Sequence, residues 1–160
     1  MDNFGDNFLW GAATASAQIE GGFNEHGRTP SIWDEAPRNK IKGNANCHVA
    51  CDHFHRYKED IALMKELGLK SYRFSVSWSR IQPDENEINQ EGLDFYINLV
   101  DELRKAGIEP LVTIYHWDLP IWVHKKGGFL SEDIIPLFEK YTKTVVDALS
   151  DKVTYWIPMN

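Results

Sequence analysis

The chain has 160 residues, 42% of them hydrophobic, which is enough for one ordinary domain with a buried core. Its formal net charge of −7 argues against nucleic acid as a partner, because binding to phosphates requires a stripe of basic residues. The sequence contains no secretory signal and no apolar stretch near the roughly 18 residues of a membrane span, so we expect a cytoplasmic protein without a membrane partner.

Short apolar runs alternate with stretches in which apolar residues recur at spacings of three and four, which predicts strands alternating with amphipathic helices. Gly68 and Gly107 lie where helix C-caps are expected, Asn89 offers an N-cap, and Pro136 is tolerated only in a first helical turn. In chain order we expect strand 8–13, helix 54–67, strand 71–78, a helix between Asn89 and Gly107, strand 109–117, a helix that begins between residues 131 and 136 and has its apolar face at 138–149, and strand 153–158.

Two helix-to-strand junctions look alike: "ELGLKSYRFS" and "KAGIEPLVTI", whose glycines Gly68 and Gly107 are 107 − 68 = 39 residues apart. A repeating unit of this size predicts parallel strands joined by crossover helices, and therefore an α/β fold. Four such units are compatible with a small open sheet or with half of an eight-stranded barrel. A whole barrel needs about 250 residues, which is more than this chain has.

Polar and aromatic residues follow the carboxyl end of each predicted strand, where parallel α/β folds place their ligand sites. Amide, imidazole and indole groups suit a polyhydroxylated ligand, because amides and neutral imidazole both donate and accept hydrogen bonds. Taken singly, each residue has a simpler explanation as a loop, core or strand-cap residue, so only the combination favours a site. The residues are Gln18, Glu20, Trp78, Arg80, His116, Trp117, Asp118 and Asn160.

Arg73 lies on the face of strand 71–78 opposite to Tyr72 and Phe74, because strand residues alternate between faces. If Tyr72 and Phe74 contact the helices, Arg73 faces a barrel interior and needs a carboxylate there, since a buried unpaired charge is very costly. Glu20 is one possible partner. Otherwise Arg73 contacts solvent, or its partner lies in further polypeptide.

Cys47 and Cys51 lie near His48 and His53, and these residue types are zinc ligands. The spacing matches no standard pair of zinc knuckles, and the chain has only these two cysteines. We therefore expect reduced structural thiols and no metal.

Several long motifs resemble the amino-terminal part of family 1 glycoside hydrolases, the β-glucosidase group. They are "FLWGAATASAQIEGG", "GRTPSIWDEAP", "VACDHFHRYKEDIALMKELGLKSYRFSVSWSRI", "EPLVTIYHWDLP" and "WIPMN", in the order of the family and over essentially the whole chain. The resemblance implies a (β/α)8 TIM barrel that hydrolyses β-linked glucosides with retention of configuration. Residues 1–160 are then the amino-terminal portion of a single barrel domain, ending after its fourth strand.

The resemblance also implies roles for individual residues. Gln18, His116 and Asn160 resemble the residues that hydrogen-bond the hydroxyls of the glycone, and Trp117 resembles a neighbour in the same subsite. Arg73 resembles the arginine that holds the nucleophilic carboxylate of the family. Trp33 resembles part of the outer wall of the pocket.

In the family, the motif that begins at Asn160 continues with the general acid/base Glu, and the nucleophilic Glu comes from a much later strand. Retaining hydrolysis requires both carboxyl groups, held about 5–5.5 Å apart, and it needs no cofactor. We therefore expect a β-glucoside or oligosaccharide substrate for the whole enzyme, no catalytic Glu in these 160 residues and no activity from them alone.

Two alternatives remain open. The first is a non-catalytic half-barrel that serves as an assembly or carbohydrate-binding unit, with the complementary carboxy-terminal part of the barrel as a partner. The second is the 6-phospho-β-glucosidase branch of the same family. The "HWDLP" form resembles the plain glucosidase branch, but the residues that decide between the branches lie near the carboxyl end of the family's barrel.

Overall fold

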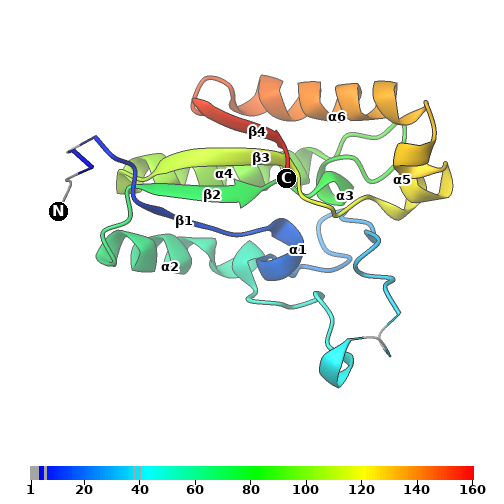
Figure 1. Ribbon diagram of the computed structural model, residues 1–160, viewed down its shortest axis with the longest axis horizontal. Helices are drawn as coiled ribbons and strands as arrows, with labels where there is room; N and C mark the ends of the chain where they lie inside the picture. The colour runs from blue at the N-terminus through cyan, green and yellow to red at the C-terminus, as the bar shows by residue number, and fades with distance from the viewer. Residues whose placement is uncertain (1–3, 6, 38, 40) are drawn as a thin grey trace.

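The computed structural model describes residues 4–5, 7–37, 39 and 41–160. Within them lies one sheet of four parallel strands in the order β1-β2-β3-β4 (Figure 1). The strands are parallel, as the repeated junctions predicted, and their order in space equals their order along the chain. The strands are β1 (Gly11–Ala13), β2 (Ser71–Ser75), β3 (Glu109–Tyr115) and β4 (Tyr155–Met159).

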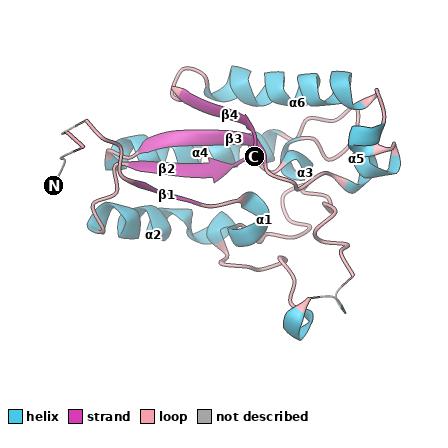
Figure 2. Ribbon diagram, in the orientation of Figure 1, coloured by secondary structure: helices cyan, strands magenta, loops and turns pink. Residues whose placement is uncertain are grey.

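Three long helices connect the strands and lie along the outer side of the curved sheet (Figure 2). They are α2 (His53–Glu66), α4 (Gln90–Ala106) and α6 (Ile134–Leu149). Shorter helical segments gather at the carboxyl end of the strands, where the ligand site was expected. They include α1 (Ser16–Ile19), α3 (Trp78–Ile81), α5 (Ile121–Lys125) and the 3-10 turn η3 (Gly128–Leu130), while the 3-10 turn η2 (Lys42–Asn44) lies in the long loop before α2. No helix of the described residues is long and apolar enough to cross a membrane.

The three long helices and four strands occur where the sequence predicted them, but several boundaries differ. Strand β2 ends at Ser75 rather than at residue 78, because the chain turns into α3 at Trp78. Asn89 does occupy the N-cap position of α4, yet its side chain makes no capping bond. Its amide instead donates to the carbonyls of Arg80 and His26, and so joins two loops at the start of the helix.

The apolar core lies between the sheet and the long helices. Tyr72, Phe74 and Val76 are at most 3% exposed and belong to this core, as the alternation of the strand predicted. Trp78 is completely buried and stacks on Tyr141 of α6 at 4.8 Å between ring centroids. The core therefore extends from the middle of the sheet to the rim where the strands end.

The hydroxyl of Tyr141 is a hydrogen-bonding link between α6 and the ends of two strands. Its single proton is shared between the carbonyl of Ile114 at 2.8 Å and that of Val76 at 3.0 Å, in a fully buried position. Tyr141→Phe is expected to lower the free energy of unfolding by about 1–3 kcal/mol, because two buried acceptors lose their donor. Urea denaturation measures this change.

Tyr57→Phe is a matched control, since Tyr57 is a partly buried tyrosine packed against the same core. Its hydroxyl makes no side-chain hydrogen bond within the described residues. Equal stability of the two variants would contradict the role given to Tyr141.

Candidate functional site at the carboxyl ends of the strands

A cavity of about 500 Å³ lies at the carboxyl end of the sheet and brings together three of the four predicted sugar-binding residues. Gln18 reaches it from α1, and His116 and Trp117 reach it from the loop after β3. Trp33, predicted for the outer wall, lines the same cavity. Segments that are 98 residues apart in the sequence, at 18 and 116, therefore contribute to one concave surface (116 − 18 = 98).

Asn160 is not part of the cavity lining but is bonded to residues at its edge. The indole N–H of Trp117 donates to the Asn160 carbonyl at 2.9 Å. The guanidinium of Arg73 donates to the Asn160 side-chain oxygen at 2.6 Å. The backbone N–H of Asn160 donates to the carbonyl of Tyr115, which holds the end of β4 against β3.

Arg73 points away from the helices, as predicted, and its Nε donates to the hydroxyl of Thr113 on the neighbouring strand at 2.9 Å. The suggestion that Glu20 pairs with Arg73 is wrong. Glu20 is 5% exposed and lies 3.3 Å from Nε of Arg80, while its other oxygen accepts a hydrogen bond from the Tyr96 hydroxyl at 2.6 Å. Both known partners of Arg73 are therefore neutral groups within the described residues.

Trp78 and Arg80 are not rim residues, although their position after β2 suggested it. Both are completely buried in α3. The guanidinium of Arg80 lies 4.0 Å from the centre of the Phe54 ring and donates to the carbonyl of Gly21 at 3.2 Å. Arg80 therefore fastens the loop after β1 to the helical layer, and the sequence contained no pattern that separates this role from ligand binding.

His116 is suited to contact a neutral polar ligand. Burial and the positive charge of Arg73 lower the pKa of its imidazole below 6.5, so the ring is neutral at pH 7. Its Nδ1 is buried and has no partner within the described residues. A neutral imidazole can donate from one nitrogen and accept at the other.

Trp117 has an unusual backbone conformation, with φ at +69°. This left-handed region is unfavourable for a bulky side chain and persists only where surrounding contacts impose it. Its indole is 55% exposed and faces the cavity. Strain of this kind is found at binding sites more often than elsewhere.

Asp118 follows directly and is only 1% exposed. One carboxyl oxygen accepts a hydrogen bond from the Ser16 hydroxyl at 2.6 Å, and the other has no partner within the described residues. Burial raises the pKa of Asp118 from 3.8 to about 6. The sequence placed Asp118 at the rim, but its side chain points into the protein instead of lining the cavity.

The loop between β1 and α2 supplies an apolar wall that sequence reasoning did not identify. Ile41, Ala45 and Ala50 line the cavity beside Trp33. No periodic pattern marks this loop, so its proximity to the strand ends becomes visible only in the fold.

Cys47 and Cys51 are free thiols. The Cys47 thiol donates to Asp34 at 3.2 Å, and burial raises the pKa of Cys47 to about 11. No cluster of three metal-ligating side chains occurs among the described residues.

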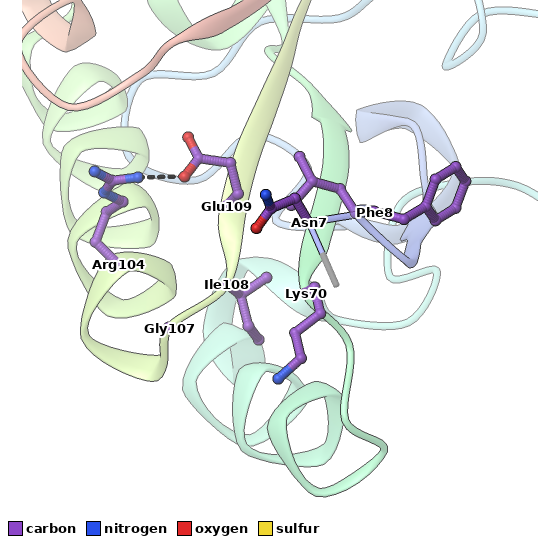
Figure 3. A pocket seen from close by; sticks show the side chains of 8 residues that line it. Asn7, Phe8, Lys70, Arg104, Gly107, Ile108 and Glu109 are labelled. Atoms are coloured by element: carbon purple, nitrogen blue, oxygen red, sulfur yellow. Dashed lines mark hydrogen bonds and ion pairs between the residues drawn. The ribbon is translucent and has the colours of Figure 1, made fainter. Parts of the chain in front are cut away.

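A second cavity, of about 460 Å³, lies at the opposite, amino-terminal end of the strands (Figure 3). Arg104 and Glu109 form an ion pair at its wall, and Lys70 and Phe8 lie on the other side. None of the predicted site residues lines it. The predicted sugar-binding residues that line a cavity therefore do so at the other, carboxyl end of the sheet.

With the geometry established, comparison with known proteins assigns the chain to a family. A model of glycosyl hydrolase family 1 matches residues 1–160. The chain belongs to glycosyl hydrolase family 1. It is 49% identical to the aryl-phospho-beta-D-glucosidase BglC of Bacillus subtilis and 48% identical to beta-glucosidase A of Acetivibrio thermocellus, over 99% and 98% of its length.

Solved structures of the family have the same fold. The beta-glucosidase from Thermotoga maritima in complex with castanospermine matches with a TM-score of 0.94 and 45% identity, covering 98% of this chain and 36% of that one. A beta-glucosidase from Exiguobacterium marinum matches with a TM-score of 0.95 and 48% identity over 99% of this chain and 36% of that one.

The chain thus spans about a third of the length of its relatives, 34% and 36% of the two curated ones. Its four parallel strands correspond to the amino-terminal part, the first four βα units, of the family's (β/α)8 barrel. The fold class predicted from the sequence is confirmed.

The raised pKa of Asp118 makes stability depend on pH. The native state binds this proton more tightly than the unfolded chain, so the stability it provides is present below about pH 4 and is lost as pH rises through about 6. A pKa of about 6 against 3.8 corresponds to about 3 kcal/mol. Asp118→Asn is expected to remove this part of the pH dependence, measured by urea denaturation from pH 4 to 8.

Asp151→Asn, at an exposed turn, is the control and should leave the dependence unchanged. An identical pH profile for Asp118→Asn and the parent protein would show that Asp118 keeps an ordinary pKa.

Proposed function

We propose that this chain forms the amino-terminal half of the sugar pocket of a retaining β-glucosidase. The observation that carries the proposal is the convergence of Gln18, His116 and Trp117 on one cavity at the carboxyl ends of the strands. An amide and a neutral imidazole can each donate to and accept from sugar hydroxyls, while the exposed indole offers an apolar face to the ring. Asn160 joins this set through its bonds to Trp117 and Arg73.

The catalytic carboxylates of this proposal come from further polypeptide. The lining of the cavity contains no Asp or Glu within the described residues. We expect the general acid/base Glu directly after Asn160, as the resemblance implies, and the nucleophilic Glu on a later strand. Within the part of the chain that the structure describes, the partners of Arg73 are the neutral Thr113 and Asn160, so its charge is available to hold that nucleophile.

We further propose that these 160 residues alone do not hydrolyse glycosides and that the complete enzyme, which we expect in the cytoplasm, needs no cofactor. Retaining hydrolysis uses one carboxylate to attack the anomeric carbon and another to protonate the leaving group and then activate water. Neither step is available to a pocket without carboxylates.

We propose a neutral glucoside as the substrate, because the "HWDLP" form resembles the plain glucosidase branch. Phosphate recognition relies on Arg and Lys, and the cavity lining contains neither within the described residues. One relative is nevertheless an aryl-phospho-beta-D-glucosidase. The 6-phospho branch therefore stays the alternative within the same reaction class.

A half-barrel that serves as an assembly or binding unit is the second candidate, favoured by the uncovered surface of α6. A groove of about 690 Å³ runs along this helix between Phe129, Ile135 and Phe138. Exposed apolar grooves of this kind mark contacts with other polypeptide. The complementary carboxy-terminal part of the barrel is the partner that we propose, because α4 packs against both α2 and α6 and the same repeat predicts a helix beside α6.

The full-length protein is expected to hydrolyse 4-nitrophenyl β-D-glucoside with the β-anomer as first product, observed by proton NMR. The purified 160 residues should show no turnover, because both carboxylates are missing. A preference for the 6-phosphorylated substrate would favour the alternative branch. Turnover by the 160 residues would contradict the proposed division of the site.

Gln18→Ala in the full-length protein should lower kcat/KM by about 10–100-fold, since a sugar hydroxyl left without its partner in the closed site costs about 1–3 kcal/mol. Gln90→Ala is the matched control, because Gln90 is an exposed glutamine that bonds only to Asp94 on its own helix. Equal activities of these two variants would remove Gln18 from the binding site.

Light scattering separates the two candidate functions. A self-contained unit should be a defined monomer or dimer that binds glucose weakly by itself. A segment of an enzyme should aggregate or require the complementary chain, and addition of that chain should restore hydrolysis.

A further inference from the structure

The Ser16–Asp118 hydrogen bond joins two loops that carry different walls of the cavity. Ser16 is the first residue of α1, the single turn that presents Gln18. Asp118 directly follows Trp117 in the loop after β3. Both side chains are buried, at 4% and 1% exposure, and the hydroxyl donates to the carboxyl at 2.6 Å.

Ser75, the last residue of β2, completes this buried connection. Its hydroxyl oxygen accepts the backbone N–H of Ser16 at 2.8 Å, and its own proton goes to the Ser16 hydroxyl at 3.2 Å. The proton of Ser16 is therefore left for Asp118. Three consecutive strands are thus linked behind the cavity by one chain of hydrogen bonds in a fixed direction.

Other buried carboxylates of this chain have a cation as partner, and Asp118 does not. Glu20 is paired with Arg80 and Asp34 with Arg28. Among the described residues, the side chain that bonds to Asp118 is the neutral Ser16. A buried carboxylate without a cation reduces stability, so its presence here is better explained by what it holds in place.

The held residue is Trp117, whose backbone is strained at φ +69°. Its indole N–H donates a hydrogen bond to the carbonyl of Asn160 at 2.9 Å. The residue that follows Trp117 in the chain is Asp118, whose buried carboxyl anchors the backbone through its hydrogen bond with Ser16. We infer that loss of that anchor would let Trp117 relax to an ordinary φ and move its indole relative to Gln18 on the other loop.

We propose that Ser16 and Asp118 are positioning residues that couple the two loops of the sugar site, so that Gln18 and Trp117 are held at a fixed separation. The inference rests on the proposed function for its kinetic consequence, and on geometry alone for the coupling of the loops. Burial raises the pKa of Asp118, the charge of Glu20 adds to the rise and the charge of Arg28 opposes it, which agrees with a site that lacks a directly bonded cation.

The test uses Ser16→Ala in the full-length protein, because a methyl group in place of a buried hydroxyl keeps the fold intact more readily than a change of Asp118. Displacement of binding groups by about 1 Å can cost about 100-fold in rate, so kcat/KM should fall 10–100-fold with a higher KM. Asp118→Asn keeps an acceptor for the Ser16 hydroxyl, so kcat/KM should stay within about 3-fold of the parent protein. Asp118→Ala removes the acceptor and should lower kcat/KM as much as Ser16→Ala does.

Ser79→Ala is the matched control. Ser79 is also completely buried and its hydroxyl pairs with another serine, Ser77, at 3.2 Å, but it lies within α3 and joins no two site loops. This variant should keep kcat/KM within about 2-fold of the parent.

Hydrogen exchange measured by mass spectrometry provides a readout that does not need activity. Ser16→Ala should speed exchange in residues 14–19 and in residues 115–120 together, while Ser79→Ala should change neither. Absence of glycosidase activity in the parent protein would overturn the proposed function but leave this coupling to be decided by exchange. Faster exchange in one loop only, or in both without any loss of kcat/KM in an active enzyme, would overturn the inference.

Discussion

The register of the four parallel strands determines which side chains meet at the site. Backbone pairing places Ala13 beside Arg73, Arg73 beside Leu111 and Leu111 beside Tyr155, so the strands end at the same edge of the sheet. A shift of any strand by one residue would exchange its two faces. Arg73 would then enter the apolar core, and the loops that carry the polar residues would no longer start at one rim.

Two networks of buried polar side chains hold the loops that follow the strands in place. In the first, Glu20 joins Arg80 and Tyr96, and it fastens the loop after β1 to the helical layer. In the second, Ser16 connects β1 and β2 to Asp118 in the loop after β3. The polar groups behind the cavity are therefore arranged by hydrogen bonds, while His116 lines the cavity itself.

The fold could be predicted from the sequence because its signals are local. Helical periodicity between Phe54 and Leu67, the glycines that follow α2 and α4, and the repeated junctions indicate these two helices and the parallel strands. The site was predicted in part, since strand ends gather polar residues but do not reveal orientation. Arg80 and Asp118 follow strand ends, yet their side chains point inward. Arg80 bonds to Glu20, which is 60 positions away in the sequence, and Asp118 bonds to Ser16, which is 102 positions away. No local pattern encodes such contacts, and the apolar wall around Ile41 was missed for the same reason.

The convergence of one sugar-binding set at the carboxyl rim is tested most directly by a crystal structure of the full-length protein with a glucose-like iminosugar inhibitor. The account predicts a ring that hydrogen-bonds Gln18, His116 and Asn160 and lies against Trp117, with a carboxylate of the later chain beside Arg73. An inhibitor bound at the opposite end of the strands, or one that contacts none of these four side chains, would contradict it.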